Sequence, residues 1–504
     1  MKILSIFTFK KAKYILLTLI LTNIYYMFKQ NFYLYVNDED NELLFKRVEL
    51  KNSTTYYENY FQNIQVNNET NIDLDELFDN YLNDTIALEK KLINEYMNAF
   101  KRMPPTNYAK WIEFAVNNGC PLHPTYYSQI DRDLKPFREK KKLIDENKIT
   151  EARVVFNKLK MIRIKNNTIY DSDNNYTDNY FLFTQDLLKI FPDDKEIVIL
   201  YNFHDNPKIL QPDIKSYMKK QIKSYKKMGI NKYNDLAYRG KDCLNQNYKK
   251  YKMNTGYLLS NKLTFTDLYP IFSSCKTICH DDILIPGFHH VNEIENLNED
   301  LIPWEEKERK LVWRGSTTGV GWSELGIGDL FRNFQRMRFV EWSMKRSSNN
   351  LPFKMDIGFS SAKNCVKKLC KLLRKMYDFK DFIDYRQQQK SKYMFTIDGH
   401  TWSSRFQAFL FSKSVVFQST YFIEWFSFLA KPWVHYVPVD LSLDDLENHL
   451  LWAVYNDEKA KQIAERANQL AYKHLTFESM QCYAGLLLLE YSDLLNIKNF
   501  EDII

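Results

Sequence analysis

The sequence predicts an α/β protein with two doubly wound lobes, each built on a sheet that contains parallel strands. Short apolar runs lead into loops rich in polar residues and glycine, and amphipathic helices follow these loops. The same alternation occurs in both halves of the 504-residue chain. We therefore expect ligands to bind at the carboxyl ends of the strands, as they do in open α/β sheets.

The composition is that of a large folded protein. Apolar residues make up 45% of the chain and charged residues 26%, which excludes wholesale disorder, collagen and coiled coils. The net charge of +7 is too diffuse to indicate nucleic acid, and the lysine runs at 219–227 and 367–371 are interpreted as solvated helix faces. Seven cysteines exclude a disulfide-built scaffold but allow a few bridges and one odd thiol.

The N-terminus predicts a signal-anchor. Residues 1–13, the expected cytosolic tail, carry four lysines and no acid, and residues 14–28 carry no charge. Flanking lysines that snorkel let the span extend over 14–36, the expected transmembrane segment. The lysines before the apolar run follow the positive-inside rule, which places the rest of the chain in the lumen. A cleaved signal peptide and a core helix are the alternatives.

An acidic lumenal stem is expected over residues 37–103. Between 38 and 95 the chain has fourteen acidic residues and five basic ones, with an ordinary N-terminal subdomain as the alternative. Five glycosylation sequons agree with a lumenal location. The predicted N-glycosylation sites are Asn52, Asn68, Asn83, Asn166 and Asn175.

The first lobe is expected over residues 104–300. Trp111, Phe114 and Ala115 suit one face of a helix. Residues 195–203 form an almost continuous apolar run, which is typical of a fully buried parallel strand. The polar stretch 204–207 follows this strand, where a ligand-facing loop belongs.

The second lobe is expected over residues 301–504. The sequence predicts strands at 310–313, 392–397 and 414–417, with a helix over 403–411 between the last two. Ser442 and Asp445 suit the start of a further helix, and apolar residues from Ile463 to His474 recur at three- and four-residue steps.

Two loops of the second lobe suit a phosphate. In the first, Gly315 lets backbone N–H groups approach an anion, Arg314 offers a charged fork, and Ser316 and Thr317 offer hydroxyls. A turn with a surface arginine is the alternative. The second loop starts at Asp398, and Gly399 breaks the strand.

The helix that follows this second loop begins near Ser403, so its N-terminus and Arg405 could face a diphosphate. The alternative is that Ser403 only caps the helix while Arg405 pairs with an acid. His435 is interpreted as a hydrogen-bonded structural histidine. A metal site is not expected, because cysteines without a second metal-binding pair favour disulfides or free thiols. This interpretation covers Cys275, Cys279, Cys365 and Cys370.

Several segments, in order, resemble the capsule-associated/Rumi-type glycosyltransferases, glycosyltransferase family 90, which include protein O-glucosyltransferases and fungal capsule xylosyltransferases. The C-terminal segments are 392–395, 398–399, 404–406, 414–416, 424–426, 431–439 and 463–475, and 313–316 resembles the family's phosphate-side loop. The thinner N-terminal segments are 130–137, 191–193 and 205–207.

The resemblance implies a GT-B architecture, with two Rossmann-like lobes and a cleft between them. It also implies inverting, metal-independent transfer from a UDP-sugar, with xylose or glucose as the leading sugars. Arg314 and Arg405 would balance the diphosphate, and Glu424 would bind the ribose. Asp398 would orient Arg405 or the nucleotide. The hydroxyl donors would be Ser316, Thr317 and Ser404.

The catalytic base is where this chain departs from the family pattern. An overlay without gaps puts Asn174 at the position of the family's aspartate, and Asp173 stands beside it. Asp173 is therefore the first candidate and Asp205 the second, with a glycosylated polar loop as the alternative for Asp173.

These features together predict a type II membrane protein of the Golgi or endoplasmic reticulum that transfers a sugar in the lumen. The expected partners are a UDP-sugar, the membrane, and a glycan, glycoprotein or glycolipid acceptor of capsule or cell-wall type, without a metal cofactor or nucleic acid. A non-catalytic lumenal glycan-binding or interaction protein on the same fold is the alternative.

Overall fold

A computed structural model gives the fold of one compact unit within 71–504. It describes residues 85–139, 144–156, 159–171, 182–204, 206–209, 267–295, 302–318, 332, 334–347, 350–363 and 365–497. The predicted tail, the predicted transmembrane segment and the stem up to residue 84 lie outside these ranges. Within them, no helix is both long and apolar enough to cross a membrane.

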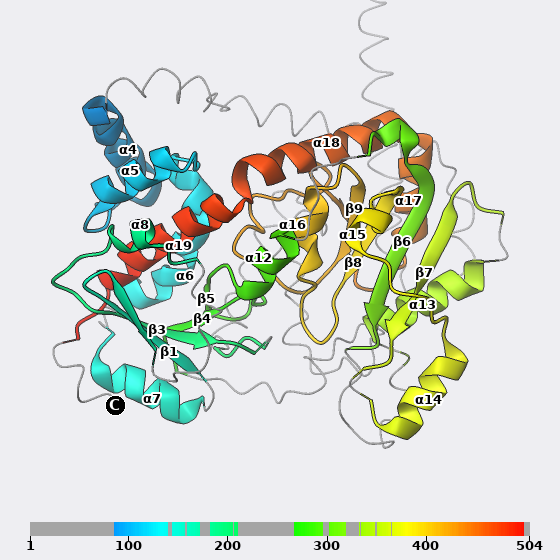
Figure 1. The fold of residues 1–504 in the computed structure, drawn as a ribbon, viewed down its shortest axis with the longest axis horizontal. Helices are drawn as coiled ribbons and strands as arrows, with labels where there is room; N and C mark the ends of the chain where they lie inside the picture. Colours follow the sequence, from blue (N-terminus) through cyan, green and yellow to red (C-terminus); the bar gives the residue numbers. More distant parts are fainter. Residues whose placement is uncertain are drawn as a thin grey trace, which may run out of the picture. The chain divides into compact units, whose positions relative to one another are not determined.

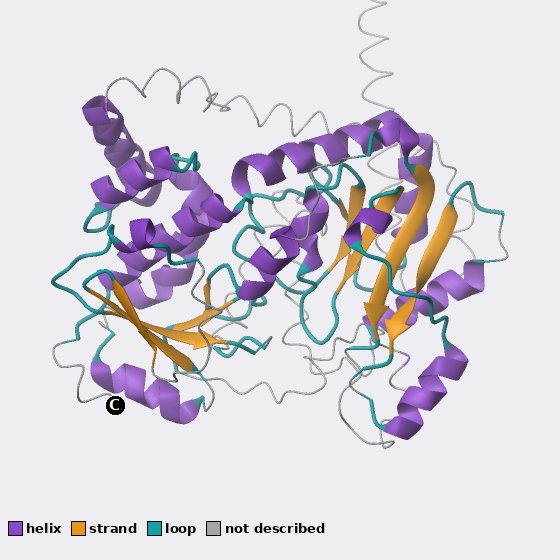
Figure 2. Ribbon diagram, in the orientation of Figure 1, coloured by secondary structure: helices purple, strands orange, loops and turns teal. Residues whose placement is uncertain are grey.

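The first sheet has five strands in the order β2-β1-β3-β4-β5. Figure 2 shows the strands of both sheets in orange. The strands are β1 (Lys160–Lys165), β2 (Thr168–Asp171), β3 (Ile197–Asn202), β4 (Ile271–Ser273) and β5 (Ile283–Leu284). The predicted buried strand at 195–203 is confirmed as β3, which runs parallel to β4. On its other side β3 pairs antiparallel with β1, so the sheet is mixed and not wholly parallel.

The antiparallel part of this sheet follows from a two-residue turn. Asn166 and Asn167 join β1 to β2 with φ values of 49° and 56°, and asparagine is among the residues that tolerate this left-handed backbone best. A connection this short can only return the chain as a hairpin. Asn166 is exposed at its tip, where a sequon is accessible.

A group of helices lies on one side of the chain with the first sheet and includes one from each end of the described residues (Figure 1). They are α4 (Thr85–Phe100), α5 (Tyr108–Asn117), η2 (Pro124–Tyr127), α6 (Ser128–Glu139), α7 (Glu146–Val155), α8 (Gln185–Leu188) and α19 (Phe477–Ser492). The predicted helix face around Trp111 is confirmed in α5. Leu88, Leu92 and Tyr96 of α4 belong to the main core, so this part of the expected stem packs against the folded unit.

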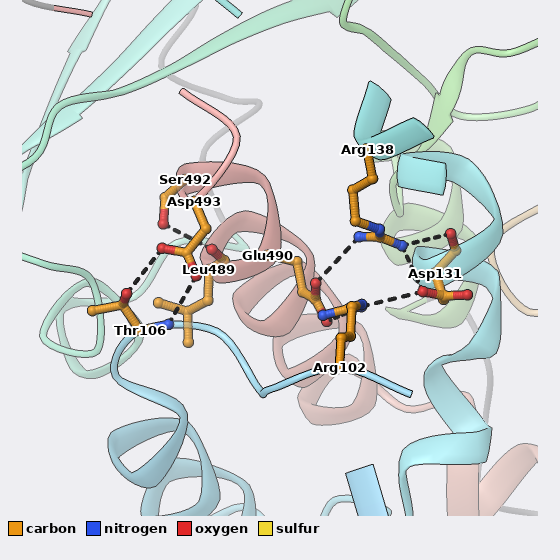
Figure 3. A network of polar contacts seen from close by, with 8 residues as sticks. All are labelled: Arg102, Thr106, Asp131, Arg138, Leu489, Glu490, Ser492 and Asp493. Carbon is orange, nitrogen blue, oxygen red and sulfur yellow. Dashed lines mark hydrogen bonds and ion pairs between the residues drawn. The ribbon is translucent and has the colours of Figure 1, made fainter. Parts of the chain in front are cut away.

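The C-terminal helix α19 returns to the first sheet and packs against α5 and α6. Its Glu490 is buried and accepts hydrogen bonds from Arg102 (2.8 Å) and Arg138 (3.4 Å), and both arginines also pair with Asp131 (Figure 3). A disulfide joins Cys120 to Cys482 of the same helix. The last helix of the range 301–504 is therefore part of the first sheet's helical layer.

The second sheet is fully parallel, with the order β10-β9-β8-β6-β7. Its strands are β6 (Glu308–Ser316), β7 (Lys354–Ser361), β8 (Ser391–Ile397), β9 (Val415–Ser419) and β10 (Val437–Pro438). The three predicted strands are confirmed as β6, β8 and β9, and every residue of β8 and β9 is buried. β6 continues to Ser316, so Arg314 and Gly315 lie in a strand where the sequence predicted a loop.

The helices of the second sheet complete this unit. They are α13 (Gln335–Arg346), α14 (Lys367–Met376), α15 (Tyr385–Gln388), α16 (Arg405–Leu410), α17 (Leu446–Tyr455) and α18 (Asp457–His474). The predicted helices at 403–411 and 463–474 are confirmed as α16 and α18. The helix expected to start near Ser442 begins at Leu446. The Asp445 side chain does not cap it and instead accepts from the backbone N–H of Asp440.

Two short elements connect the sheets along the chain, α12 (Phe288–Glu295) and η5 (Trp304–Glu306). Helix α12 lies against α16 (Figure 1). Close to this contact, Lys276 and Ile423 exchange backbone hydrogen bonds of 3.0 and 2.7 Å. The loop after β4 is thereby joined to the loop after β9.

Candidate functional site at the carboxyl ends of β6 and β8

The strand order of the second sheet has a switch point between β6 and β8. The chain passes from β6 outward to β7 and then returns to β8 on the other side of β6. At such a point the connections diverge and leave a crevice at the carboxyl ends, which is where open α/β sheets bind ligands. The two loops singled out in the sequence, after Gly315 and after Ile397, both leave the sheet at this place.

Arg405 lies at the switch point. It is the first residue of α16, and its Nη1 donates a hydrogen bond to the carbonyl oxygen of Arg314 on β6. Ser404 occupies the N-cap position, although its side chain does not cap the helix. The predicted placement of Ser404 and Arg405 at the start of a helix is thus confirmed, while their contacts with a donor stay a prediction.

Arg314 points away from the switch point, toward β7. Its Nη2 contacts the Asp356 carboxylate at 2.8 Å, and its other donors reach the carbonyl oxygens of Trp313, Asp356 and Asp381 at 2.9–3.0 Å. Its charge is therefore matched within the fold. The contact of Arg314 with a diphosphate stays a prediction, and this geometry does not support it.

Arg336 on α13 occupies the position that the sequence had suggested for Arg314. Its Nη1 donates to the Ser316 carbonyl oxygen (3.0 Å) and to Thr318 Oγ1 (2.5 Å), and its Nε donates to the Asp398 carbonyl oxygen (3.2 Å). The guanidinium thereby links the ends of β6 and β8. Nothing in the sequence around Gln335-Arg336-Met337-Arg338 distinguishes this arginine from its neighbours, because its contacts are all distant along the chain.

Arg336 forms no ion pair with a carboxylate of the described residues, although the Asp398 carboxyl is close enough to act on its charge. Its guanidinium is buried, and its acceptors are carbonyl and hydroxyl oxygens. Burial, followed by the nearby charge of Arg405, lowers the pKa of Arg336 to about 9, so the group remains a cation at neutral pH. Two positive charges therefore meet at the switch point.

Gly399 allows this close approach of the two strand ends. A Cβ at this position would lie 2.8 Å from Thr318 Oγ1 and 2.9 Å from Arg336 Nη2. The hydroxyl of Thr317 donates to the carbonyl oxygen of Lys363 and accepts from its backbone N–H, each at 2.9 Å. Thr317 thus fixes the segment after β7, while the Ser316 hydroxyl lies 3.4 Å from Thr318 Oγ1.

Asp398 is buried and anchors the segment after β9. Its Oδ1 accepts from Thr420 Oγ1 at 2.6 Å, and its Oδ2 accepts from the backbone N–H of Tyr421 at 2.8 Å. Burial raises the pKa of Asp398 to about 7, against the effect of these two hydrogen bonds. The carboxylate thus orients the Thr420–Tyr421 backbone, and these contacts differ from the role toward Arg405 that the sequence suggested.

Glu424 forms a buried pair with His290 of α12. Glu424 Oε2 and His290 Nε2 are 2.9 Å apart, and the backbone N–H of Gly287 donates to His290 Nδ1 at 2.9 Å. Because Nδ1 accepts, the ring proton must be on Nε2, and a neutral imidazole donates to the carboxylate. Burial raises the pKa of Glu424. The expected contact of Glu424 with a ribose stays a prediction.

Both candidate bases, Asp173 and Asp205, lie outside the described residues, and so do the sequons at Asn52, Asn68, Asn83 and Asn175. The described neighbours of Asp205 form a hydrogen-bonded frame at the carboxyl end of β3. Asn202 Nδ2 donates to the carbonyl oxygen of Asn206 at 2.8 Å, and the buried Asp282 carboxylate accepts from the N–H groups of Lys208 and Ile209 at 2.8 Å each.

Three of the cysteines singled out in the sequence are in disulfides, and His435 is hydrogen-bonded to the backbone. Cys365 and Cys370 form a disulfide, and Cys279 is also disulfide-bonded, whereas Cys275 is a buried cysteine outside a disulfide. The absence of a metal stays a prediction. The part of the chain that the structure describes contains no cluster of three or more potential metal ligands. His435 accepts from the backbone N–H of Lys431 at 2.9 Å, and burial lowers its pKa to about 3, as expected for a structural histidine.

Residues 259–501 match the family model described as glycosyl transferase family 90, and this range includes both strand ends of the crevice. Protein O-glucosyltransferase 1 of Rattus norvegicus is 28% identical over 248 residues, which cover 45% of this chain and 58% of the rat protein. Protein O-glucosyltransferase 2 of Danio rerio is 28% identical over 239 residues, covering 45% of this chain and 43% of that protein.

A viral relative shows a similar match. The uncharacterized protein 035R of Invertebrate iridescent virus 3 is 28% identical over 236 residues, which cover 42% of this chain and 20% of the viral protein. The matched part of this chain thus spans little more than half of the rat relative and less of the other two.

Proposed function

We propose that the protein is a glycosyltransferase that binds a nucleotide-diphosphate sugar at the β6/β8 switch point. Residues 259–501 match the glycosyl transferase family 90 model, as the sequence motifs predicted. The observation that carries this proposal is the pair of cations, Arg336 and Arg405, at that point. Neither forms an ion pair with a carboxylate within the described ranges.

The electrostatics favour an anionic ligand. A buried guanidinium that forms no ion pair loses much of its hydration energy, and a second cation nearby raises this cost. The nearby Asp398 carboxyl offsets the cost only in part, because burial still lowers the pKa of Arg336. A bound diphosphate would offset this cost. As the bond between the sugar and the diphosphate breaks, negative charge grows on the leaving diphosphate oxygen. Arg405 uses one N–H for Arg314 and keeps others for a ligand, so Arg405 is the direct contact. Arg336 adds positive charge and holds the strand ends together.

The proposed reaction moves xylose or glucose from UDP to a hydroxyl group of the acceptor. A carboxylate takes the proton of that hydroxyl, the oxygen attacks the anomeric carbon, and the bond to the diphosphate breaks as UDP leaves. This is an inverting displacement without a metal. Asp173 and Asp205 are the proposed bases, and the described residues on both sides of Asp205 are hydrogen-bonded at the carboxyl end of β3.

The proposed acceptor is a glycan, glycoprotein or glycolipid, including one of capsule or cell-wall type. The names of the curated relatives, protein O-glucosyltransferases, support a glycoprotein acceptor and a glucose donor. Ser316, Ser404 and Glu424 are proposed to contribute polar contacts to the donor, with Glu424 on the ribose.

We place this activity in the lumen of the Golgi or endoplasmic reticulum, with residues 14–36 as the anchor and residues 1–13 in the cytosol. Disulfides Cys120–Cys482 and Cys365–Cys370 support this location, because such bonds persist in oxidising compartments. The exposed sequon at Asn166 is compatible with glycosylation there.

The proposal is tested by calorimetry with UDP and by UDP release from a panel of UDP-sugars. We expect UDP to bind, and Arg405→Ala to lower turnover at least 100-fold, as loss of a preorganised charged contact does. Arg309→Ala is the matched control, because Arg309 is exposed at the opposite end of β6. Failure of UDP to bind at millimolar concentration would reject the transferase and favour a non-catalytic glycan-binding protein.

A further inference from the structure

Helix α14 carries a concentration of positive charge that the proposed reaction does not use. The helix lies in the crossover from β7 to β8, and it contains no acidic residue. Its basic residues are Lys367, Lys368, Lys371, Arg374 and Lys375, all of them exposed. None of the five forms an ion pair with another residue of the described ranges.

The helix presents these cations on one face. Leu369 and Leu373 are buried and attach the opposite face to the protein. Lys367, Lys371 and Lys375 follow one another at four-residue steps, so they form a row with a spacing of about 6 Å along the helix. An unpaired cationic row of this kind matches a surface with many negative charges.

Apolar side chains flank the cationic row. Val366, just before the helix, is 42% exposed, and Leu372 within it is 41% exposed. The Cys365–Cys370 disulfide spans the first turn and fixes the start of the helix. Cations beside exposed aliphatic side chains are typical of helices that lie in the headgroup region of a bilayer, whereas a solvated helix face needs no exposed leucine or valine.

The helix leaves the sheet at the same edge as the crevice. Thr317, at the end of β6, is hydrogen-bonded to Lys363, which lies four residues before α14. Figure 1 shows α14 beyond the carboxyl ends of β6 and β7. A flat surface that contacts α14 would therefore lie on the side of the sheet where the switch point opens.

We propose that α14 binds an anionic membrane surface and so holds the carboxyl edge of the second sheet toward the bilayer. The lysine row contacts the lipid headgroups, and Val366 and Leu372 enter the region just below them. This inference is independent of the proposed transferase activity, because it concerns lipid binding alone.

The test is flotation of the full chain with phosphatidylcholine vesicles that contain or lack phosphatidylserine. We expect stronger binding to the anionic vesicles and a decrease with added salt. The triple variant Lys367→Gln, Lys371→Gln, Lys375→Gln should reduce binding to anionic vesicles on the order of 100-fold, at about 1 kcal/mol for each lysine. The parent protein and the triple variant both contain residues 14–36, so binding through this segment does not contribute to the difference between them.

The matched control is Lys110→Gln, Lys135→Gln, Lys390→Gln, which removes the same net charge from exposed positions on other elements. It should keep the preference for anionic vesicles. Equal losses in the two triple variants would overturn the proposal, since net charge alone would then explain the binding. Leu372→Ser should weaken vesicle binding but not binding to polyglutamate. An equal effect on both would overturn the proposal and indicate that α14 binds an acidic polypeptide instead of a bilayer.

Discussion

His290 donates a hydrogen bond to Glu424 across 2.9 Å, and both side chains are buried. The two residues belong to α12 and to the loop after β9, which are far apart in the sequence. The neutral state of the imidazole follows from the N–H of Gly287, which occupies Nδ1. The pair thus fixes one carboxylate next to the proposed donor site.

Replacing Glu424 tests this pair. Glu424→Ala leaves the Nε2–H of His290 buried without an acceptor, and we expect a loss of about 1–3 kcal/mol in the free energy of unfolding. Glu424→Gln keeps an acceptor oxygen and should lose less than half of that. Urea unfolding of both variants measures the difference. Glu458→Ala, at an exposed position of α18, is the control that should unfold like the parent protein, and equal losses in Ala and Gln variants would contradict the assignment.

Gly399→Ala tests whether Arg336 supports the anion site. The added Cβ would lie 2.9 Å from Arg336 Nη2 and 2.8 Å from Thr318 Oγ1, so the guanidinium must move. We expect the affinity for UDP to fall about tenfold or more. The melting temperature should fall as well, because Arg336 is buried and links the ends of β6 and β8. Calorimetry and thermal unfolding give the two quantities. Arg309→Ala, at an exposed position at the opposite end of β6, is the control and should leave both quantities unchanged.

The Cys120–Cys482 disulfide should contribute strongly to stability. It joins residues 362 positions apart, whereas Cys365–Cys370 joins residues five positions apart. Since a cross-link removes more freedom from the unfolded chain when the loop is longer, Cys120→Ser with Cys482→Ser should cost about 2–5 kcal/mol. Cys365→Ser with Cys370→Ser is the matched pair and should cost clearly less. Guanidinium unfolding without reductant compares the two, and a reversed order would show that native contacts, and not loop length, decide the effect.

Asp398 should make the free energy of unfolding fall as the pH rises, which is opposite to the usual effect of an aspartate. Its pKa in the folded protein is about 7 because the carboxyl is buried, while an exposed aspartate has a pKa of about 4. Between these values the folded state binds more protons than the unfolded state, so this residue makes stability fall as pH rises, by up to about 1.4 kcal/mol per pH unit.

Asp398→Asn should remove this part of the pH dependence. The asparagine oxygen can still accept from Tyr421, and its amide can donate to the Thr420 hydroxyl, so the fold is kept. Urea unfolding of the parent and the variant between pH 4 and pH 7 measures the change. Identical pH profiles would mean that Asp398 is ionised throughout this range.

One strand of the first sheet and three strands of the second could be predicted from the sequence, because their signals are local. The apolar runs at β3, β6, β8 and β9 are long enough to identify buried strands, and Gly399 identifies where β8 must end. The extent of β6 could not be predicted, since Arg314 and Gly315 look like loop residues until β7 pairs with them over this range. The mixed pairing of the first sheet likewise depends on one Asn-Asn turn.

The sequence by itself determined the alternation of strands and helices, the order of the family motifs and the place of Arg405 at the start of a helix, because these depend on residues close together in the chain. Only the tertiary structure decided that Arg314 is paired with Asp356 and that Arg336 stands at the switch point beside Arg405. It also decided that α19 returns to the first sheet. The physical reason is that the partner of a charged or apolar side chain is chosen by packing across the fold, which local spacing does not encode.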